Sequence, residues 1–377
     1  MEPQQNLRDD KFPAFSHNAE QAKTACISPR VAVLIPCYNE ILTIAAVVRD
    51  FLKALPHAEI YVYDNNSTDG CIEALQQLLR GVVADSSDAD FDWVAASPRV
   101  HFGSELRQGK GNVVRTMFRE VDADVYLMVD ADCTYDAADA PRLVASVAEQ
   151  GYDMVIGDRL SSSYFAENKR RFHGVGNKLV RQLINSLFNR RRGERVQDIM
   201  TGYRAFSRDF VKTCPVLSKG FEIETEITVH ALFNNFKITS LTIAYHDRPQ
   251  GSVSKLNTYQ DGMRVLLLIF NLFRSCRPLL FFSMVSALCM LPAIGFLIPV
   301  LFEYASTGIV YKLPSFVASC VFLMLAVWSF FTGLILDTMN QNQRKLYELS
   351  ANLINLQDVN YRPPTRFALR GGGILRQ

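Results

Sequence analysis

The sequence predicts an α/β protein in which a mostly parallel sheet is covered by helices on both faces, followed by two helices long enough to cross a membrane. Short, almost entirely apolar runs alternate with helix-spaced segments from Val31 to Ile156. Apolar strands of this kind are typical of parallel sheets that are buried on both faces. Two longer apolar stretches lie close to the C-terminus. Together these observations predict an α/β domain with a membrane anchor.

The strand candidates are each followed by polar residues. The strand ranges are 31–35, 59–63, 124–129 and 153–156, with helix-like apolar spacing at 41–55 and 71–79. In open α/β sheets, ligands bind beyond the carboxyl ends of the strands. The candidate site therefore comprises four segments, namely Pro36–Glu40, Asp64, Asp130–Asp132 and Gly157–Arg159.

Two carboxylates, Asp130 and Asp132, follow the third strand candidate. Mg²⁺ and Mn²⁺ usually bind one or two protein carboxylates and complete their coordination with substrate phosphates. A solvated surface turn can carry the same pattern, but the position after an apolar strand, with a second acid-ended strand at Asp64, favours a site. The pair therefore predicts a metal site for a diphosphate-bearing substrate.

Charge and cysteine content narrow the classes of function. Forty basic against thirty-eight acidic side chains give a formal net charge of +2, so no overall positive field favours nucleic acid. The eight cysteines include no Cys-x-x-Cys pair, which predicts reduced cysteines instead of a disulfide framework or a zinc site. His173, His230 and His246 lack metal-ligand spacing and are expected to be structural or hydrogen-bonding residues.

The apolar stretches Pro278–Phe302 and Ser315–Leu336 contain no charged side chain before their ends. About 20 such residues suffice to span a bilayer, so two buried helices of a soluble domain are the less favoured alternative. Basic side chains flank the pair: Arg264, Arg274 and Arg277 precede the first stretch, and Arg344 and Lys345 follow the second. The link between the two stretches contains one basic residue, Lys312. The positive-inside rule therefore predicts that both ends of the hairpin face the cytoplasm.

These features divide the chain into five parts. They are a polar N-terminal tail (1–30), the α/β domain (31–258), an amphipathic juxtamembrane segment (259–277), a transmembrane hairpin (278–336) and a cytoplasmic C-terminal tail (337–377). A basic amphipathic segment beside a span is expected to lie in the membrane interface. Residues 177–188 show similar spacing, which fits either the interface or packing on the sheet.

Six motifs follow one another in the α/β domain. They are Val31–Glu40 (VAVLIPCYNE), Asp64–Gly70 (DNNSTDG), Gly109–Gly111 (GKG), Asp130–Asp132 (DAD), Asp198–Arg204 (DIMTGYR) and Gly220–Glu222 (GFE). In this order and spacing, from about Val31 to Lys255, the chain resembles the family-2 inverting glycosyltransferases of the GT-A fold. More narrowly, it resembles the branch of dolichyl-phosphate mannosyltransferases and polyprenyl-phosphate glycosyltransferases. The C-terminal hairpin is similar to that of bacterial polyprenyl-phosphate members.

The resemblance implies a role for each motif. Donor-binding residues would be Pro36, Tyr38, Glu40, Asp64, Lys110 and Asp130. The catalytic set would be Asp130, Asp132, Asp198 and Arg204, with Mg²⁺ or Mn²⁺ held by Asp132 and Asp130. Asp198 would orient the acceptor or act as a base. Many relatives carry a second aspartate where this chain has Asn65, so the role of Asp64 is the more secure of the two.

A lipid-phosphate acceptor requires cations, because an anionic phosphate must approach an anionic diphosphate. A phosphate with a second pKa near 6 is mostly dianionic at pH 7, so its attack needs no strong general base. The candidate acceptor-binding residues are Arg159, Arg170, Arg171, Arg248, Ser252 and Lys255, with Lys110, Lys169 and Arg204 as further cations. Any single one fits a solvated surface charge, but Arg248 and Lys255 match the family pattern Arg-x-x-Gly-Ser-x-Ser-Lys.

The resemblance thus implies transfer of one sugar from a nucleotide-diphosphate sugar to a polyprenyl phosphate of the undecaprenyl or dolichyl type, for cell-envelope glycan or glycoconjugate modification. A UDP-sugar is favoured over a GDP-sugar as donor. The other expected partners are the lipid bilayer and, by resemblance, further copies of the chain; nucleic acid is not expected. The expected location is the inner (cytoplasmic) membrane, with the catalytic domain and both termini in the cytoplasm.

Two other functions stay open. A processive polysaccharide synthase or another lipid glycosyltransferase is one, although the Gln/Arg-x-x-Arg-Trp signature of the processive enzymes is absent, since no arginine precedes Trp93 or Trp328. Two spans also cannot enclose a polymer channel alone. The other is a non-catalytic sugar-nucleotide-binding membrane protein, against which the intact motif residues argue.

Overall fold

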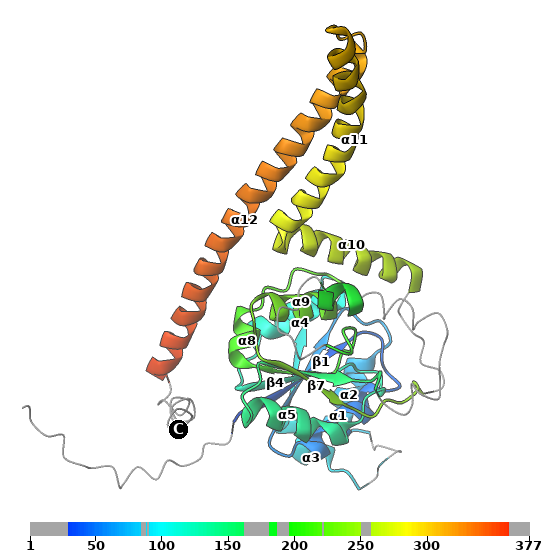
Figure 1. Ribbon diagram of the computed structural model, residues 1–377. Helices are drawn as coiled ribbons and strands as arrows, with labels where there is room; N and C mark the ends of the chain where they lie inside the picture. The colour runs from blue at the N-terminus through cyan, green and yellow to red at the C-terminus, as the bar shows by residue number, and fades with distance from the viewer. Residues whose placement is uncertain are drawn as a thin grey trace, which may run out of the picture.

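An α/β domain and a long helical hairpin make up the molecule (Figure 1). The computed structural model describes residues 29–83, 88, 90–161, 181–186, 196–220, 222–249 and 258–361. Within these residues the two parts are joined by a helix that lies across one side of the domain (Figure 1).

In the described part of the chain, seven strands form one sheet in the order β3-β2-β1-β4-β6-β5-β7. Their bounds are β1 (Val31–Cys37), β2 (Glu59–Asp64), β3 (Val100–Ser104), β4 (Val125–Met128), β5 (Met154–Asp158), β6 (Arg204–Ser207) and β7 (Ile238–Thr242). Neighbours are parallel except that β6 runs antiparallel to β4 and β5. The prediction of a mostly parallel α/β sheet is confirmed. The strands β3, β6 and β7 add to the four predicted ones, and their polar residues explain why apolar runs do not reveal them.

Helices cover both faces of the sheet. Their bounds are α1 (Ile44–Ala54), α2 (Cys71–Leu79), α3 (Trp93–Ala96), α4 (Lys110–Glu120), α5 (Ala140–Ala148), α8 (Arg208–Thr213) and α9 (Ile223–Phe233), with short 3-10 turns η1 (Ser97–Arg99) and η2 (Ala137–Asp139). Alternate residues of a strand point to opposite faces. In β1, Ala32 and Leu34 join the core under α4, α8 and α9, whereas Val33 and Ile35 join the core under α1, α2 and α5. The central strand is therefore apolar throughout because it is buried on both faces.

The amphipathic segment forms α10 (Thr258–Cys276), which lies between the α/β domain and the hairpin (Figure 1). Its Ile269 and Phe273 are buried in the core shared with α9. Four other apolar side chains of α10 are exposed, namely Met263, Leu266, Leu267 and Phe270. The helix thus has one apolar side on the domain and a second one that is exposed.

The hairpin consists of α11 (Pro278–Thr307) and α12 (Leu313–Tyr361). Among the described residues, these two helices are long and apolar enough to cross a membrane. The expected second span ends at Leu336, but the helix continues to Tyr361. No glycine or proline occurs between Asp337 and Tyr361, so nothing in the sequence breaks the helix there.

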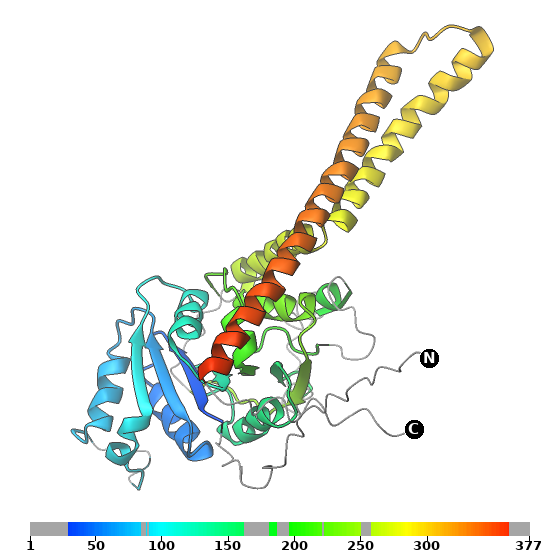
Figure 2. The ribbon, with the colours of Figure 1, turned by 90° about the vertical axis from the view of Figure 1, so that its left-hand side faces the viewer.

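The extension of α12 returns along the α/β domain (Figure 2). The Tyr347 hydroxyl lies 2.8 Å from Oγ1 of Thr213 on α8. The Arg344 guanidinium lies 3.9 Å from the centre of the Phe233 ring at the end of α9. The first part of the expected C-terminal tail is therefore a helix docked on the domain.

Candidate active site

The carboxyl ends of β1 and β2 lie side by side, because these parallel strands pair Cys37 with Asp64. The loops that follow are tied together by hydrogen bonds. The Thr68 N–H donates to Asn39 Oδ1 at 2.7 Å, and the Asn39 N–H donates to Ser67 Oγ at 3.0 Å. The Ser67 N–H in turn donates to the Asp64 carboxylate at 3.1 Å. The predicted donor residues of these loops share one edge of the sheet, and they are Pro36, Tyr38, Glu40 and Asp64.

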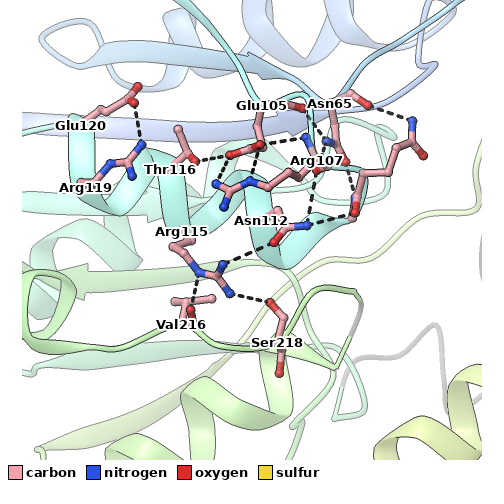
Figure 3. Close-up of polar contacts among 12 residues, drawn as sticks. Asn65, Glu105, Arg107, Asn112, Arg115, Thr116, Arg119, Glu120, Val216 and Ser218 are labelled. Atoms are coloured by element: carbon pink, nitrogen blue, oxygen red, sulfur yellow. Dashed lines mark hydrogen bonds and ion pairs between the residues drawn. The ribbon is translucent and has the colours of Figure 1, made fainter.

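Asn65 has a structural role that the sequence does not reveal (Figure 3). Its amide nitrogen donates to the backbone carbonyls of Glu105 and Arg107 at 2.8 and 2.9 Å. Its carbonyl oxygen accepts the Gly109 N–H at 2.7 Å. An aspartate could not make the two donor contacts. Asn65 therefore holds the segment that leads from β3 to the Gly109–Gly111 motif.

The two glycines of this motif allow the start of α4 to approach another backbone closely. A side chain on Gly111 would place its Cβ 2.1 Å from the Ser218 carbonyl oxygen, and one on Gly109 would meet the Lys219 carbonyl oxygen at 2.1 Å. Gly109 also has a φ of +126°, which favours glycine. This close approach places Lys110, the residue between the two glycines, at the first turn of α4.

Lys110 bridges two carboxylates. Its Nζ lies 2.5 Å from Asp130 Oδ1 and 2.6 Å from Glu224 Oε1. Burial lowers the pKa of the Lys110 ammonium, but attraction to Asp130 and Glu224 outweighs burial, so the pKa is raised and the group stays charged. Glu224 is a site residue that the motif ending at Glu222 does not single out. The only sequence signal is the alternation of three acids, Glu222, Glu224 and Glu226, at the start of α9.

Asp132 also has a basic partner. Arg248 Nη2 donates to Asp132 Oδ2 at 2.6 Å, while the Thr134 hydroxyl donates to Asp132 Oδ1 at 2.6 Å. The segment after β7 brings Arg248 here because it runs antiparallel to the loop that follows Asp132. Tyr245 forms a bridge with Tyr135, and the His246 N–H donates to the Thr134 carbonyl at 2.9 Å.

The two carboxylates fit a divalent cation that is shared with a substrate. Within the described ranges, no group of three or more His, Cys, Asp and Glu side chains is arranged to hold a metal ion. Mg²⁺ and Mn²⁺ need only one or two protein carboxylates when phosphates supply other oxygens. In this structure Asp130 and Asp132 each attract a cationic side chain, so the loop after β4 is already a place where positive charge is stabilised.

Asp198 binds Arg159 in a two-point ion pair. Arg159 Nε and Nη2 lie 2.8 and 3.2 Å from the two carboxylate oxygens of Asp198. The backbone N–H groups of Arg159 and Met200 donate to the same carboxylate at 3.3 and 3.2 Å. Arg159 also lies 5.4 Å from the centre of the Tyr245 ring. With four donors directed at it, Asp198 is arranged to fix the Arg159 guanidinium.

Arg204 lies beneath the loop of residues 198–202 and is fully buried. Its guanidinium donates to the carbonyls of Ile199 and Thr201 at 2.5 and 3.0 Å and to the Thr228 hydroxyl at 2.8 Å. Burial lowers the pKa of Arg204 to about 10, which leaves it protonated at neutral pH. In this setting Arg204 supports the loop that carries Asp198 and does not face the outside of the domain.

The remaining predicted cations and the serine lie outside the described residues. They are Lys169, Arg170, Arg171, Ser252 and Lys255. His173 also falls there, and only 181–186 of the second amphipathic stretch is described. Of the predicted acceptor residues, the structure describes Arg159 and Arg248.

Comparison with known proteins identifies the family. The sequence profile of glycosyl transferase family 2 matches residues 32–214. Glycosyltransferase AglJ of Haloferax volcanii is 30% identical over 327 residues, which cover 85% of this chain and 98% of AglJ. The chain belongs to glycosyl transferase family 2. The family and the GT-A fold that the motifs predict are therefore confirmed.

Two further relatives have informative names. The polyprenol monophosphomannose synthase of Mycolicibacterium smegmatis is 27% identical over 245 residues, which cover 63% of this chain and 85% of the synthase. The undecaprenyl-phosphate mannosyltransferase of Micrococcus luteus is 27% identical over 233 residues, which cover 59% of this chain and 86% of that enzyme.

Proposed function

We propose that this family-2 glycosyltransferase is anchored in a membrane and transfers one sugar from a nucleotide-diphosphate sugar to a polyprenyl phosphate. The names of the mycobacterial and micrococcal relatives support the acceptor class. Transfer of a single sugar is favoured over polymer synthesis, because the two candidate spans in the described part of the chain are too few to enclose a polymer channel.

The observation that carries the acceptor proposal is the contact between α9 and α10. At its start α9 presents Glu224 to Lys110, beside Asp130. Ile227 on the same helix shares a core with Ile269 of α10. The exposed side of α10 is apolar and adjoins a candidate span, which favours a place in the membrane interface. A lipid phosphate at the bilayer surface would then lie near the site.

In the proposed reaction an oxygen of the polyprenyl phosphate attacks the anomeric carbon of the donor sugar. The new bond joins this carbon to the phosphate oxygen, and the bond to the donor diphosphate breaks with inversion at carbon. The electron pair of the broken bond leaves with the nucleoside diphosphate. Because the attacking phosphate is mostly dianionic at pH 7, no residue has to remove a proton from it.

Arg159 and Arg248 have the charge that this reaction needs on the acceptor side. Each guanidinium would lower the cost of bringing two anions together. Asp198 would then position Arg159 and not act as a base. On the donor side, Lys110 holds Asp130 in place through a contact of 2.5 Å. Asp132 and Asp130 would hold a Mg²⁺ or Mn²⁺ ion, which when bound stabilises the charge on the departing diphosphate.

The proposed topology places the catalytic domain and both termini in the cytoplasm, in the inner membrane of a bacterial-type cell. It rests on the basic residues at both ends of the hairpin and on the short link between α11 and α12, whose Lys312 lies 3.8 Å from Glu303. A tag inserted at Thr307 should be labelled only from the non-cytoplasmic side of sealed vesicles. Labelling from the cytoplasmic side would contradict this orientation.

The activity is tested with the purified full chain in lipid nanodiscs and a panel of nucleotide sugars. We expect nucleoside diphosphate to be released with one donor, a UDP-sugar, only when polyprenyl phosphate is present. Release of a nucleoside monophosphate would indicate transfer of a sugar phosphate instead. Release of nucleoside diphosphate that does not depend on polyprenyl phosphate would also contradict the proposal. So would the absence of release with every donor in the panel.

A further inference from the structure

One side of α12 faces its own chain from Ser319 to Tyr347. The residues on this side recur every seven positions, and they are Ser319, Ala326, Gly333, Asn340 and Tyr347. The first two are buried. Gly333 packs on α11, where an added Cβ would lie 2.8 Å from Cβ of Phe282. Asn340 contacts the Ser275 carbonyl and Tyr347 contacts Thr213. The rotation of α12 about its own axis is therefore fixed.

A different side of α12 carries large apolar side chains that are exposed. We call Met339, Leu346, Leu349 and Leu353 the outer seam; they are 55, 63, 59 and 62% exposed. At about 100° per residue, the leucines lie roughly 130° around the helix from the side that contacts the chain. Figures 1 and 2 show α12 along the outside of the molecule, with the domain on its other side.

Lipid cannot cover the far end of the outer seam. The charged residue that ends the apolar stretch is Asp337. At 1.5 Å per residue, Leu346 and Leu353 lie about 14 and 24 Å farther along the helix. The polar headgroup region is only about 5 to 8 Å deep on each side of a bilayer. These leucines would thus be in water unless a protein surface covers them.

The spacing of the outer seam is that of a coiled coil. Steps of seven, three and four residues place Met339, Leu346 and Leu353 at a positions of a heptad and Leu349 at a d position. The same register continues into the apolar stretch, where Val321, Leu325, Trp328 and Ile335 are also exposed. A self-complementary seam of this kind pairs with an identical helix when the two are parallel and in register.

We propose that the outer seam binds the outer seam of a second copy of this chain and forms a parallel coiled-coil dimer. The proposal rests on the membrane anchoring proposed above, because a bilayer would hold every copy of α12 in the same direction and at the same depth. Flanking positions are compatible with pairing. In a parallel pair, Lys345 at a g position would face Ser350 at an e position of the second copy, so these flanking positions bring no like charges together.

The first test is disulfide cross-linking in native membranes. In a background that carries Cys320→Ser, which removes the exposed native cysteine of α12, Leu349→Cys is compared with Glu348→Cys. Both side chains are exposed in one copy, but only position 349 would meet its own counterpart across a parallel seam. Mild oxidation should give at least fivefold more covalent dimer for Leu349→Cys. Equal yields, or cross-linking only to a different protein, would overturn the proposal.

The second test places a charge in the seam. Leu349→Glu should convert the dimer to a monomer by single-molecule photobleaching in nanodiscs, whereas Glu348→Lys should leave it a dimer. A wild-type chain that is monomeric, or a dimer that survives Leu349→Glu, would overturn the proposal. The cysteine variants still decide the question if Leu349→Glu does not fold. Neither readout depends on sugar transfer, so a failure of the proposed activity would be recognised separately.

Discussion

Replacement of Asp198 by asparagine should slow transfer to polyprenyl phosphate roughly 30- to 150-fold by releasing Arg159. The Asp198 side chain is 1% exposed and the Arg159 side chain 15%. Removing one partner of a buried ion pair costs about 3–5 kcal/mol. Because Arg159 keeps some contact with water, we expect about 2–3 kcal/mol to appear as lost transition-state stabilisation. At about 1.36 kcal/mol per factor of ten, this gives the expected loss of rate.

The assay is a double-mutant cycle on kcat/KM for polyprenyl phosphate at saturating donor. It compares Asp198→Asn, Arg159→Ala and the double variant. If Asp198 acts only by positioning Arg159, the double variant should be no slower than the slower single variant. A matched control is the distant ion pair of Arg208 with Asp122, at 2.9 Å, where Arg208→Ala should change kcat/KM less than twofold.

Multiplicative losses in the cycle would contradict a purely positioning role for Asp198. They would mean that Asp198 contributes independently of Arg159, as a general base would.

Three further predictions follow from the site. Asp132→Asn should abolish transfer with the circular dichroism spectrum unchanged, and excess chelator should silence the wild type until Mg²⁺ or Mn²⁺ is restored; full activity in chelator would contradict the metal role. Arg248→Ala should raise the KM for polyprenyl phosphate and lower the metal concentration for half-maximal rate several-fold, because a competing cation leaves Asp132; an unchanged metal requirement would count against this. Asn65→Asp should lower the melting temperature by several degrees, because the buried Glu105 carbonyl loses its donor at about 1–3 kcal/mol and the part-buried Arg107 carbonyl loses one of its two donors. The exposed Asn66→Asp is the control, and equal melting temperatures for both variants would show that the contacts of Asn65 are not stabilising.

The positions of Asp64, Asp130 and Asp132 could be predicted because local patterns determine them. Each follows a strand that is recognisable from its apolar residues, and parallel strands place their carboxyl ends at one edge of the sheet. Local sequence patterns do not reveal which basic side chains contact these aspartates. Arg248 reaches Asp132 because the segment after β7 runs antiparallel to the loop after Asp132, and such a long-range contact leaves no local signal.

The sequence does not reveal that the Arg204 side chain points into the domain. It begins β6, an antiparallel strand between β4 and β5, and its guanidinium donates to carbonyls of the preceding loop. The role of Glu224 is not predictable from the sequence for a related reason, because its contact with Lys110 joins two helices that are far apart in the sequence. Hydropathy likewise located the second apolar stretch but not the continuation of α12 to Tyr361, which depends on helix propensity and on docking to the domain.

Passage of sugar into lipid is the most direct test of the proposed activity. Nanodiscs that contain the full chain are incubated with a radiolabelled nucleotide sugar, with and without polyprenyl phosphate, and the mixture is extracted with organic solvent. We predict label in the organic phase only with polyprenyl phosphate, in a product that contains one sugar and one phosphate per lipid, and none with Asp132→Asn. Label confined to a water-soluble glycan or to protein, or a lipid product with two phosphates, would contradict the account.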